Sequence, residues 1–560
     1  MARKKEIFLY PDGVDRRNNG GFYTPTIWVD YAHKMISEQI GENWKDEYVV
    51  WDNCCGSKNL TRDYRFKELY CSTLFESELE IGKRYNPEAT SFQFDFLNDE
   101  IEAGLFGESK VPAGLLEAFK QNKKIVFLLN PPYASSSNIG DTAKKGLCNT
   151  IIGQWMKDNK IGASSQNLYA QFLYRIILFK QTYNLTNCNI ALFSPTLFLT
   201  GQGYSNFRKE FLDEFLFSKG IQFRASHFAD VADSWGISFS VWNSGINSNN
   251  FNYDIVDIDN NGEIYRLFGK QLYNVDNGKT SSEWLREETK KMKTFDVPNL
   301  TSAIKVRDGV GTRNGKCCKD YIGYFNNGGN NVDKNIQQVA LFSSAYSGAV
   351  GSSIIAENFY KVVSLFSARK LIDKDWINSK DEYFAPNEQH PQFQEFVNDS
   401  IVYSLFHSSS NQSSLRQIEY HDKLWDIKNE FFWMSKSEIE NLANEHNLDA
   451  IYNDARISNE RFVYEKLKSI TLSSEAQVVL NKASELVRSS FKYREMFSEE
   501  HPEYQLDKCW DAGFYQIKAL LKEYMKDDLK EFQTSYKALV DKMRPQVYEL
   551  GFLKKTKQHI

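Results

Sequence analysis

The residues best suited to chemistry in this 560-residue sequence are Asn130-Pro131-Pro132-Tyr133. They follow the run Ile125–Leu129, which is short, apolar and rich in β-favouring residues, so it predicts a buried strand. Each proline fixes its own φ and keeps the preceding residue out of the helical region. The tetrapeptide is therefore predicted to form a stiff turn at the carboxyl end of a strand, where open α/β sheets bind their ligands.

Such a turn favours one kind of reaction. The amide oxygen of Asn130 and the main-chain carbonyl of Pro131 can together accept both hydrogens of an exocyclic amino group. This localises the nitrogen lone pair, which can then attack a methyl sulfonium, while Tyr133 offers a flat face for a flipped base. The alternative is a plain turn that only ends a strand.

Composition sets broad limits on the protein. With 41% hydrophobic and 25% charged residues, the chain is expected to hold two or three globular domains. The net charge of −5 argues against non-specific coating of nucleic acid, so any DNA binding must depend on a local site. No apolar run approaches the ~20 residues needed to cross a bilayer, and the eight cysteines form no C-x-x-C pair. We expect a cytoplasmic protein with reduced thiols, no metal site and no membrane contact.

Apolar runs before residue 130 alternate with helical patterns, and each ends near a polar or aromatic side chain. The expected strands are Tyr48–Asp52, Leu69–Leu74, Ser91–Leu97 and Ile125–Leu129, and the helices between them include Gly114–Lys123. This alternation predicts an α/β fold with a doubly wound, mostly parallel sheet. The ligand candidates at the strand ends are Asp52, Glu76, Asp95 and Asn130.

The order of these motifs carries a family resemblance. Phe22-Tyr23-Thr24-Pro25 comes first, then Asp52-Asn53-Cys54-Cys55-Gly56, an acidic segment with Glu76, Phe94-Asp95-Phe96-Leu97, and finally Asn130–Tyr133. Over roughly residues 20–250 the chain resembles the γ-class of DNA amino-methyltransferases, chiefly the N6-adenine enzymes of bacteria and phages. The resemblance implies a seven-stranded Rossmann-like sheet and S-adenosyl-L-methionine (AdoMet) as the cofactor.

The resemblance also implies roles for single residues. Asn130, Pro131, Pro132 and Tyr133 would be catalytic, and Tyr133 and Phe239 would stack on the target base. The residues expected around AdoMet are Tyr23, Thr24, Pro25, Asp52, Cys54, Gly56, Glu76, Asp95 and Phe96. From the residues alone, Thr24-Pro25 also reads as a helix N-cap followed by the first helical position.

The sequence departs from the family pattern in two places. The family turn usually reads Gly-x-Gly, whereas this chain has Gly56-Ser57-Lys58. The usual acid at the end of the second strand falls at Thr73 or Phe75, so Glu76 or Glu78 would have to replace it. These departures motivate an alternative function, a non-catalytic DNA-binding or regulatory subunit that keeps the methyltransferase fold.

The rest of the chain extends this plan. We expect a flexible lead-in over residues 1–21, a methyltransferase domain over 22–290, a candidate DNA target-recognition region over 291–390 and a helical region over 391–560. An antiparallel hairpin over Phe223–Phe228 and Ser238–Trp242 is expected to close the sheet. Apolar residues three and four apart between Phe514 and Met543 predict one long amphipathic helix.

The expected function is site-specific transfer of a methyl group from AdoMet to adenine N6 in double-stranded DNA. Cytosine N4 presents the same chemistry, and the tetrapeptide does not separate the two targets. RNA or a protein glutamine is a more distant substrate. A separate nuclease or defence-system subunit is a further expected partner, in a restriction-modification context.

Overall fold

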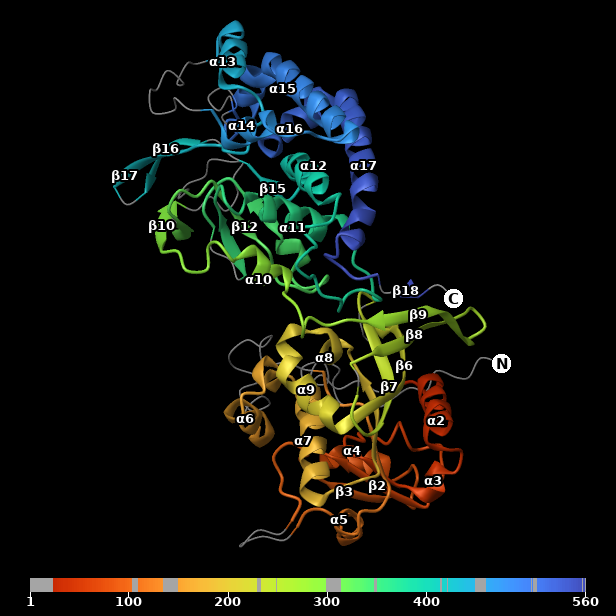
Figure 1. Cartoon of the computed structure of the whole chain (residues 1–560). Coiled ribbons are helices and arrows are strands. Elements are labelled where there is room, and N and C mark those ends of the chain that lie inside the picture. Colours follow the sequence, from red (N-terminus) through yellow and green to blue (C-terminus); the bar gives the residue numbers. More distant parts are fainter. Residues whose placement is uncertain are drawn as a thin grey trace. The chain divides into compact units, whose positions relative to one another are not determined.

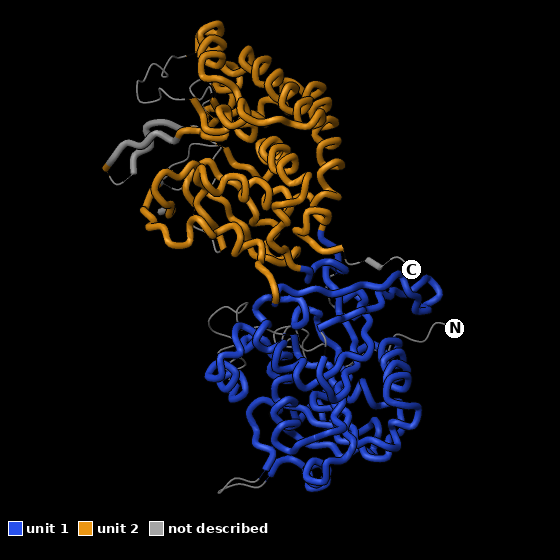
Figure 2. Tube along the Cα trace, in the orientation of Figure 1, with its two compact units in different colours: residues 1–276, 374–381, 556–560 blue, residues 277–373, 382–555 orange. Residues whose placement is uncertain are grey.

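The computed structural model describes residues 24–102, 109–133, 150–228, 233–247, 249–298, 314–346, 350–412, 415–420, 422–448, 460–504, 506, 511–555 and 557–558. The chain divides into two compact units. Unit 1 comprises residues 1–276, 374–381 and 556–560, and unit 2 comprises residues 277–373 and 382–555 (Figure 2). Residues 291–373 and 382–555 thus belong to one compact unit.

Unit 1 is built on one mixed sheet of ten strands, in the order β18-β9-β8-β6-β7-β5-β4-β1-β2-β3 (Figure 1). The strands are β1 (Val49–Asp52), β2 (Glu68–Thr73), β3 (Thr90–Gln93), β4 (Ile125–Leu129), β5 (Cys188–Ser194), β6 (Phe215–Arg224), β7 (Gly236–Ser244), β8 (Phe251–Ile258), β9 (Ile264–Leu272) and β18 (Lys557–Gln558). The α/β class is confirmed. The expected count of seven strands is too low, because β8, β9 and β18 extend the sheet beyond β6.

The strand directions define where the sheet reverses its winding. Strands β1 to β5 pair in parallel, whereas β7 runs antiparallel to both β5 and β6. The expected antiparallel closing pair is therefore present, but its first strand is β6 (Phe215–Arg224) and not Phe223–Phe228, because the chain forms a 3-10 turn at Ala225–His227. The chain passes from β1 outward through β2 to β3 and then returns to place β4 on the other side of β1. The carboxyl ends of β1 and β4 consequently flank a topological switch point, the usual ligand site of such sheets.

Helices cover both faces of this sheet, because the buried residues of each strand alternate between two apolar cores. The helices are α2 (Thr26–Ile40), α3 (Trp44–Glu47), α4 (Glu76–Gly82), α5 (Ala113–Lys120), α6 (Ile151–Asp158), α7 (Leu168–Tyr183), α8 (Leu197–Thr200) and α9 (Ser205–Glu214). Val126 and Leu128 of β4 pack in the same core as α2, whereas Ile125 and Phe127 pack in the core that includes α5 and α7. This double coverage accounts for the continuous apolar run of β4.

Three predicted elements differ from the structure. Strand β3 ends at Gln93, so Asp95 and Phe96 lie in the turn after it. The expected amphipathic helix after residue 514 is two helices, because the chain leaves the helical conformation at Met525 (φ −136°). Thr24 is not the N-cap of α2; Pro25 occupies that position.

Unit 2 combines small sheets with a group of helices. Its elements are α10 (Ser281–Leu285), β10 (Thr294–Pro298), β11 (Asn314–Cys318), β12 (Gly323–Asn326), β13 (Ala340–Phe342), β14 (Gly351–Ile354), α11 (Phe359–Leu371), α12 (Phe393–Phe406), β15 (Ser410–Asn411), β16 (Leu415–Tyr420), β17 (Lys423–Ile427), α13 (Lys436–Glu445), α14 (Phe462–Lys468), α15 (Ser474–Glu500), α16 (Phe514–Tyr524) and α17 (Lys526–Glu549). Helices α11, α12 and α15 to α17 share one large apolar core with β12 and β13.

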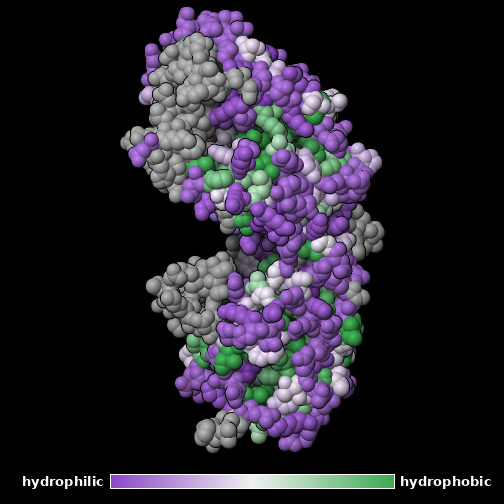
Figure 3. Space-filling model, turned by 60° about the vertical axis from the view of Figure 1, so that its left-hand side comes forward, coloured by the Kyte–Doolittle hydropathy of each residue, from purple (hydrophilic) through white to green (hydrophobic). Residues whose placement is uncertain are grey.

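Within the described ranges, no helix combines the length and the apolar character that a transmembrane span requires. On the face drawn in Figure 3, hydrophobic side chains are scattered among hydrophilic ones.

Candidate active site at the carboxyl ends of β1 and β4

Asn130 follows β4 directly and is held at both ends of its amide. Its Nδ2 donates to Oγ1 of Thr24 at 2.9 Å, and its Oδ1 accepts a hydrogen bond from the Tyr133 hydroxyl at 2.5 Å. Thr24 is 4% exposed, so its hydroxyl is fixed in place by the packing around it. The two contacts set which end of the amide carries the oxygen, which is the property that an acceptor for a substrate amino group needs.

Tyr133 lies three residues beyond Asn130 and is partly exposed. Burial of its hydroxyl and the nearby Cys54 thiol raise the pKa of Tyr133 well above its usual value, so the phenol stays a hydrogen-bond donor. Its ring meets the rings of Tyr169 and Trp235 edge-on, at centroid distances of 6.5 and 6.1 Å. One edge of the Tyr133 ring is therefore braced by aromatic neighbours.

The carboxyl end of β1 differs, because its polar groups are buried without partners. Asp52 is 0% exposed and Asn53 is 1% exposed. No described side chain pairs with either carboxylate oxygen of Asp52, and the amide oxygen and nitrogen of Asn53 have no hydrogen-bond partner among the described residues. Buried polar groups are normally satisfied, so such a cluster at a switch point calls for a bound polar ligand.

The charge state of Asp52 follows from this burial. Burial raises the pKa of Asp52 well above its usual range, and the neighbouring Cys71 thiol adds to the effect. The backbone of Cys54 and the positive charge of Lys58 act in the opposite direction. A cationic or hydrogen-donating ligand group near Asp52 would relieve the penalty of the buried charge.

Cys54 connects the two strand ends. It is half-buried, and the backbone of Asn130 hydrogen-bonds its sulfur. Burial and the Asp52 carboxylate raise the pKa of Cys54 well above its usual range, so it is a neutral thiol rather than a nucleophile.

The turn after β1 accommodates the unusual lysine. Gly56 and Lys58 both adopt left-handed backbone conformations, with φ of 49° and 66°. The Lys58 side chain runs along Gly82 of α4, and its Nζ donates to the carbonyls of Tyr85 (3.1 Å) and Asn86 (3.4 Å). Lysine is therefore tolerated where the family pattern has glycine, and its ammonium group is bound by the main chain after α4.

The acid after β2 is better represented by Glu78 than by Glu76. Glu76 is exposed at the start of α4, whereas the half-buried Glu78 carboxylate accepts a hydrogen bond from Thr73 at the end of β2. The Glu78 charge also contributes to the raised pKa of Cys54. Two large apolar side chains beside it, Leu74 and Phe75, are 40% and 44% exposed.

Asp95 organises the turn after β3. Its carboxylate accepts hydrogen bonds from the Leu97 backbone (3.0 Å) and the Asn98 side chain (2.7 Å), and it is half-buried. Phe96 points into the core, where it is 3% exposed and stacks on Phe172 at 4.9 Å. This packing favours a structural role for Phe96.

Arg175 of α7 holds the turn after β3 in place, and the sequence analysis did not predict this role. Its guanidinium donates to the carbonyls of Phe96 and Asp99, and it lies over the rings of Phe94 and Phe96. Burial lowers its pKa to about 10, an effect that Asp95 and Asp99 oppose. An arginine inside an otherwise apolar helix was the available signal.

Phe239, the expected second base-stacking residue, is fully buried in β7 and packs on Phe193 at 4.7 Å. Trp235, four residues earlier, is the aromatic residue that contacts Tyr133. Tyr23, another predicted cofactor residue, lies outside the described residues. The predicted roles of the remaining site residues stay predictions.

One arginine of unit 2 has a structural role. Arg369, within the candidate recognition region, is 0% exposed and donates to the carbonyls of Gly329, Asn331 and Lys334. It therefore holds a loop in place and cannot reach a DNA base edge.

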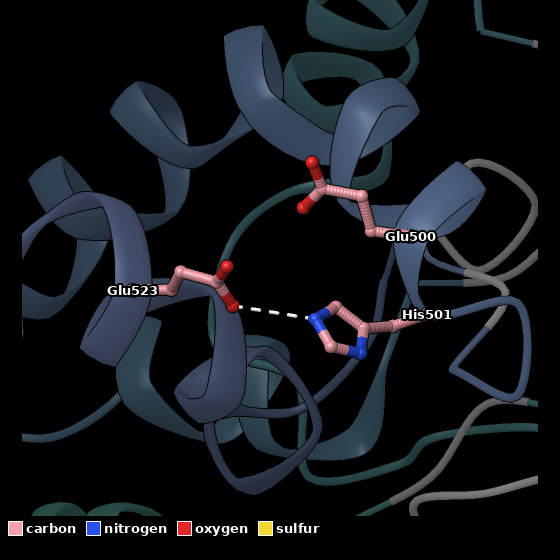
Figure 4. Close-up of side chains that lie close together, drawn as sticks. All are labelled: Glu500, His501 and Glu523. Carbon is pink, nitrogen blue, oxygen red and sulfur yellow. Dashed lines mark hydrogen bonds and ion pairs between the residues drawn. The ribbon is translucent and has the colours of Figure 1, made fainter.

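A separate group in unit 2, Glu500, His501 and Glu523, has the composition of a cation site (Figure 4). Its ligand atoms lie within 4.8 Å of one another. His501 Nε2 lies 3.3 Å from a Glu523 oxygen, and the Tyr524 hydroxyl donates to Glu500 at 2.5 Å. Both glutamates are exposed, and the protein's own contacts account for the cluster without an ion.

The comparisons with known proteins gave no family assignment. No family model and no curated protein sequence matches the chain. Among solved structures, the modification subunit of a candidate type I restriction enzyme from Vibrio vulnificus is 16% identical to this chain, with a TM-score of 0.29. The match covers 43% of this chain and 48% of that one. A type I restriction-modification methyltransferase subunit from Streptococcus thermophilus is also 16% identical, with a TM-score of 0.28 and coverage of 42% and 47%.

The protein chain in a structure of the DrdV–DNA complex is 17% identical to this chain, with a TM-score of 0.32. The match covers 44% of this chain and 28% of that one. This chain therefore spans less than half the length of these three proteins. Because the TM-scores are low, these likenesses carry no argument about function, which has to be argued from the geometry of the site.

Proposed function

We propose that this protein is an AdoMet-dependent methyltransferase that acts on the exocyclic amino group of a base extruded from double-stranded DNA, with adenine N6 as the target. The observation that carries the proposal is the orientation of the Asn130 amide between Thr24 and Tyr133, at a switch point where Asp52 and Asn53 are buried with no described side-chain partner. One strand end offers an oriented acceptor, and the adjacent one offers unsatisfied polar groups for a ligand.

The residues around β1 and β2 fit AdoMet as the donor. Asp52 carries a buried carboxylate that an ammonium group would neutralise, and Glu78 offers oxygens for ribose hydroxyl groups. Leu74 and Phe75 present apolar surface to an adenine ring. When bound, AdoMet supplies a methyl group attached to an electrophilic sulfonium.

The residues around β4 then orient the acceptor. An amide oxygen has two lone pairs, so Asn130 can keep the Tyr133 hydroxyl bond and still accept a hydrogen from the target amino group. The Pro131 carbonyl is proposed to accept the second hydrogen, which localises the nitrogen lone pair. Alignment of donor and acceptor in one site supplies much of the acceleration without a covalent enzyme intermediate.

The alternative of a non-catalytic subunit rested on Lys58 and on the missing acid at the end of the second strand. The Lys58 ammonium group is bound by the carbonyls of Tyr85 and Asn86, and the Glu78 carboxylate is hydrogen-bonded to Thr73 at the end of β2. Both contacts support the catalytic proposal over this alternative. Cytosine N4 remains a chemically equivalent target. A separate nuclease or defence-system subunit is retained as a proposed partner.

The test combines AdoMet calorimetry with a methyl-transfer assay on unmethylated genomic DNA. Asn130→Ala is expected to lower transfer by about 10²- to 10³-fold, as the loss of one oriented catalytic hydrogen bond does, and to leave AdoMet affinity nearly unchanged. Asn187→Ala is the matched control, because Asn187 is exposed at the opposite edge of the sheet, before β5. Nucleoside mass spectrometry of the product distinguishes N6-methyladenine from N4-methylcytosine.

Folded wild-type protein that binds no AdoMet would overturn the proposal. Equal transfer by wild type and Asn130→Ala would overturn the assigned role of the tetrapeptide.

A further inference from the structure

One segment of unit 1 comes from a distant part of the sequence. Residues 374–381 are flanked on both sides by unit 2 but belong to unit 1 (Figure 2). We call this segment the strap. Gln222 of β6 donates from its Nε2 to the carbonyls of Trp376 (2.9 Å) and Ile377 (3.2 Å), which fixes the strap against the sheet.

Two further residues of unit 1, Lys270 and Thr200, anchor the second half of the strap. Lys270 of β9 is 1% exposed; its Nζ donates to the Ile377 carbonyl and pairs with the Asp381 carboxylate at 2.7 Å. Thr200 donates from Oγ1 to the Lys380 carbonyl at 2.7 Å. The backbone on either side of Lys380 is therefore held by buried groups of unit 1.

The strap lies close to the start of β7. A Cβ atom on Gly236 would lie 2.7 Å from the Trp376 carbonyl oxygen, so only glycine allows this approach. Trp235, the residue before Gly236, is in turn fixed by a hydrogen bond from the Ala225 backbone to its carbonyl, at 3.0 Å.

This arrangement brings a cation to the candidate active site. The Lys380 ammonium lies 5.9 Å from the centroid of the Trp235 ring. The same ring lies 6.1 Å from the Tyr133 ring, at an interplanar angle of 88°. Tyr133, Trp235 and Lys380, which are far apart in sequence, thus form a continuous row, and all three are partly exposed.

We propose that Trp235 and Lys380 form a nucleic-acid contact beside the target base, with Trp235 bordering the extruded base and Lys380 binding a phosphate next to it. The proposal rests on the proposed function. Aromatic side chains that alternate with cations are the combination that binds unstacked bases and their backbone. The strap makes this contact part of unit 1, although residues 374–381 lie within the segment 291–390 that was predicted as the target-recognition region.

The salt dependence of DNA binding tests the role of Lys380. Loss of one phosphate contact is expected to reduce the slope of log affinity against log salt concentration by about 1. Lys380→Ala should show this reduction and bind unmethylated genomic DNA fragments more weakly, Lys380→Arg should restore both, and AdoMet affinity should not change. Lys374→Ala is the matched control, since Lys374 is an exposed lysine of the same strap.

The role of Trp235 is tested by methyl transfer at saturating DNA. Trp235→Ala is expected to lower the rate about tenfold, as the loss of one base–aromatic stack does, whereas Trp235→Phe retains most of the rate. Thermal unfolding of each variant excludes a general loss of structure.

The outcomes separate the two proposals. If the wild type binds DNA and transfers methyl groups but Lys380→Ala keeps the wild-type salt slope and affinity, the strap contact is wrong and the proposed function stands. If the wild type binds AdoMet but transfers no methyl group to DNA, the proposed function and the strap contact both fall.

Discussion

The carboxyl ends of β1 and β4 lie side by side at the switch point, yet the polar side chains at the two ends differ in their hydrogen bonding. After β4, the Asn130 amide is bound at its nitrogen and its oxygen by Thr24 and Tyr133. After β1, Asp52 and Asn53 are buried with no described partner side chain. At the β4 end, where the methyl-accepting base is proposed to bind, the protein itself orients the polar group. At the β1 end, where AdoMet is proposed to bind, the polar side chains need a ligand to complete their hydrogen bonding. We therefore expect the β1 end to dominate cofactor affinity and the β4 end to dominate rate.

The largest expected effect outside the tetrapeptide is at Asp52. In Asp52→Asn the neutral amide loses a charge-assisted bond to the ligand, so AdoMet affinity should fall roughly 10- to 100-fold. Calorimetric titration of AdoMet into wild type and Asp52→Asn measures this difference in affinity. Unchanged affinity would mean that the carboxylate does not face the cofactor, and the contrast between the strand ends would lose its functional meaning.

The same substitution has an opposite effect on the protein without ligand. The pKa of Asp52 is raised in the folded state, so the proton is held more tightly there than in the unfolded chain, and the free energy of unfolding falls as pH rises from the unfolded pKa near 3.9 toward the folded pKa. Asparagine removes this dependence. Urea unfolding without AdoMet should find Asp52→Asn more stable than wild type at pH 8 and show no such advantage at pH 3.5.

A smaller effect, on the turnover number, is expected from substitution of Thr24, which tests the β4 end of the comparison. Thr24→Val removes the acceptor for Asn130 Nδ2 while keeping the side-chain shape, so the amide loses one of the contacts that orient it. The turnover number should fall about tenfold with little change in AdoMet affinity, because orientation rather than binding is affected. Steady-state kinetics tests this, and Thr24→Ser should recover most of the rate. A loss of cofactor affinity in Thr24→Val would instead assign Thr24 to the AdoMet site.

The smallest effect is expected at Lys58. Lys58→Gly relieves a left-handed backbone but loses the bonds to the Tyr85 and Asn86 carbonyls, so the free energy of unfolding should change by no more than about 1 kcal/mol. AdoMet affinity should change by less than about threefold. Lys58→Ala, which keeps the strained backbone and loses the bonds, should be the less stable of the two variants in chemical denaturation. A large gain of AdoMet affinity in Lys58→Gly would show that the lysine does obstruct the site.

Local sequence patterns predicted the elements of unit 1 where the signal is itself local. The run Ile125–Leu129 forms a strand with the predicted bounds, because a short apolar run rich in β-favouring residues is visible from residue types alone. Strand β3 was predicted too long because Phe94 and Phe96 alternate with polar residues, yet the Asp95 carboxylate bonds to its own turn and ends the strand.

The contacts of the site were less predictable than its elements. Thr24 has the residue type of a helix cap, but its hydroxyl binds Asn130, which is 106 residues away. Phe239 and Trp235 are both aromatic residues near the start of β7, and only packing reveals that Phe239 is buried in the core while Trp235 borders Tyr133. Such pairings depend on strand register and on side-chain direction, which residue types do not specify.

The strap also has a consequence for how the chain folds during synthesis. Lys270 is buried in β9, and its carboxylate partner Asp381 leaves the ribosome 111 residues later. Until then the sheet of unit 1 either carries an uncompensated ammonium group or leaves the β9 edge undocked, because a buried lone charge is strongly destabilising. The sheet that bears the candidate site therefore completes its folding only after the whole first segment of unit 2, residues 277–373, has been made, rather than as an independent early domain.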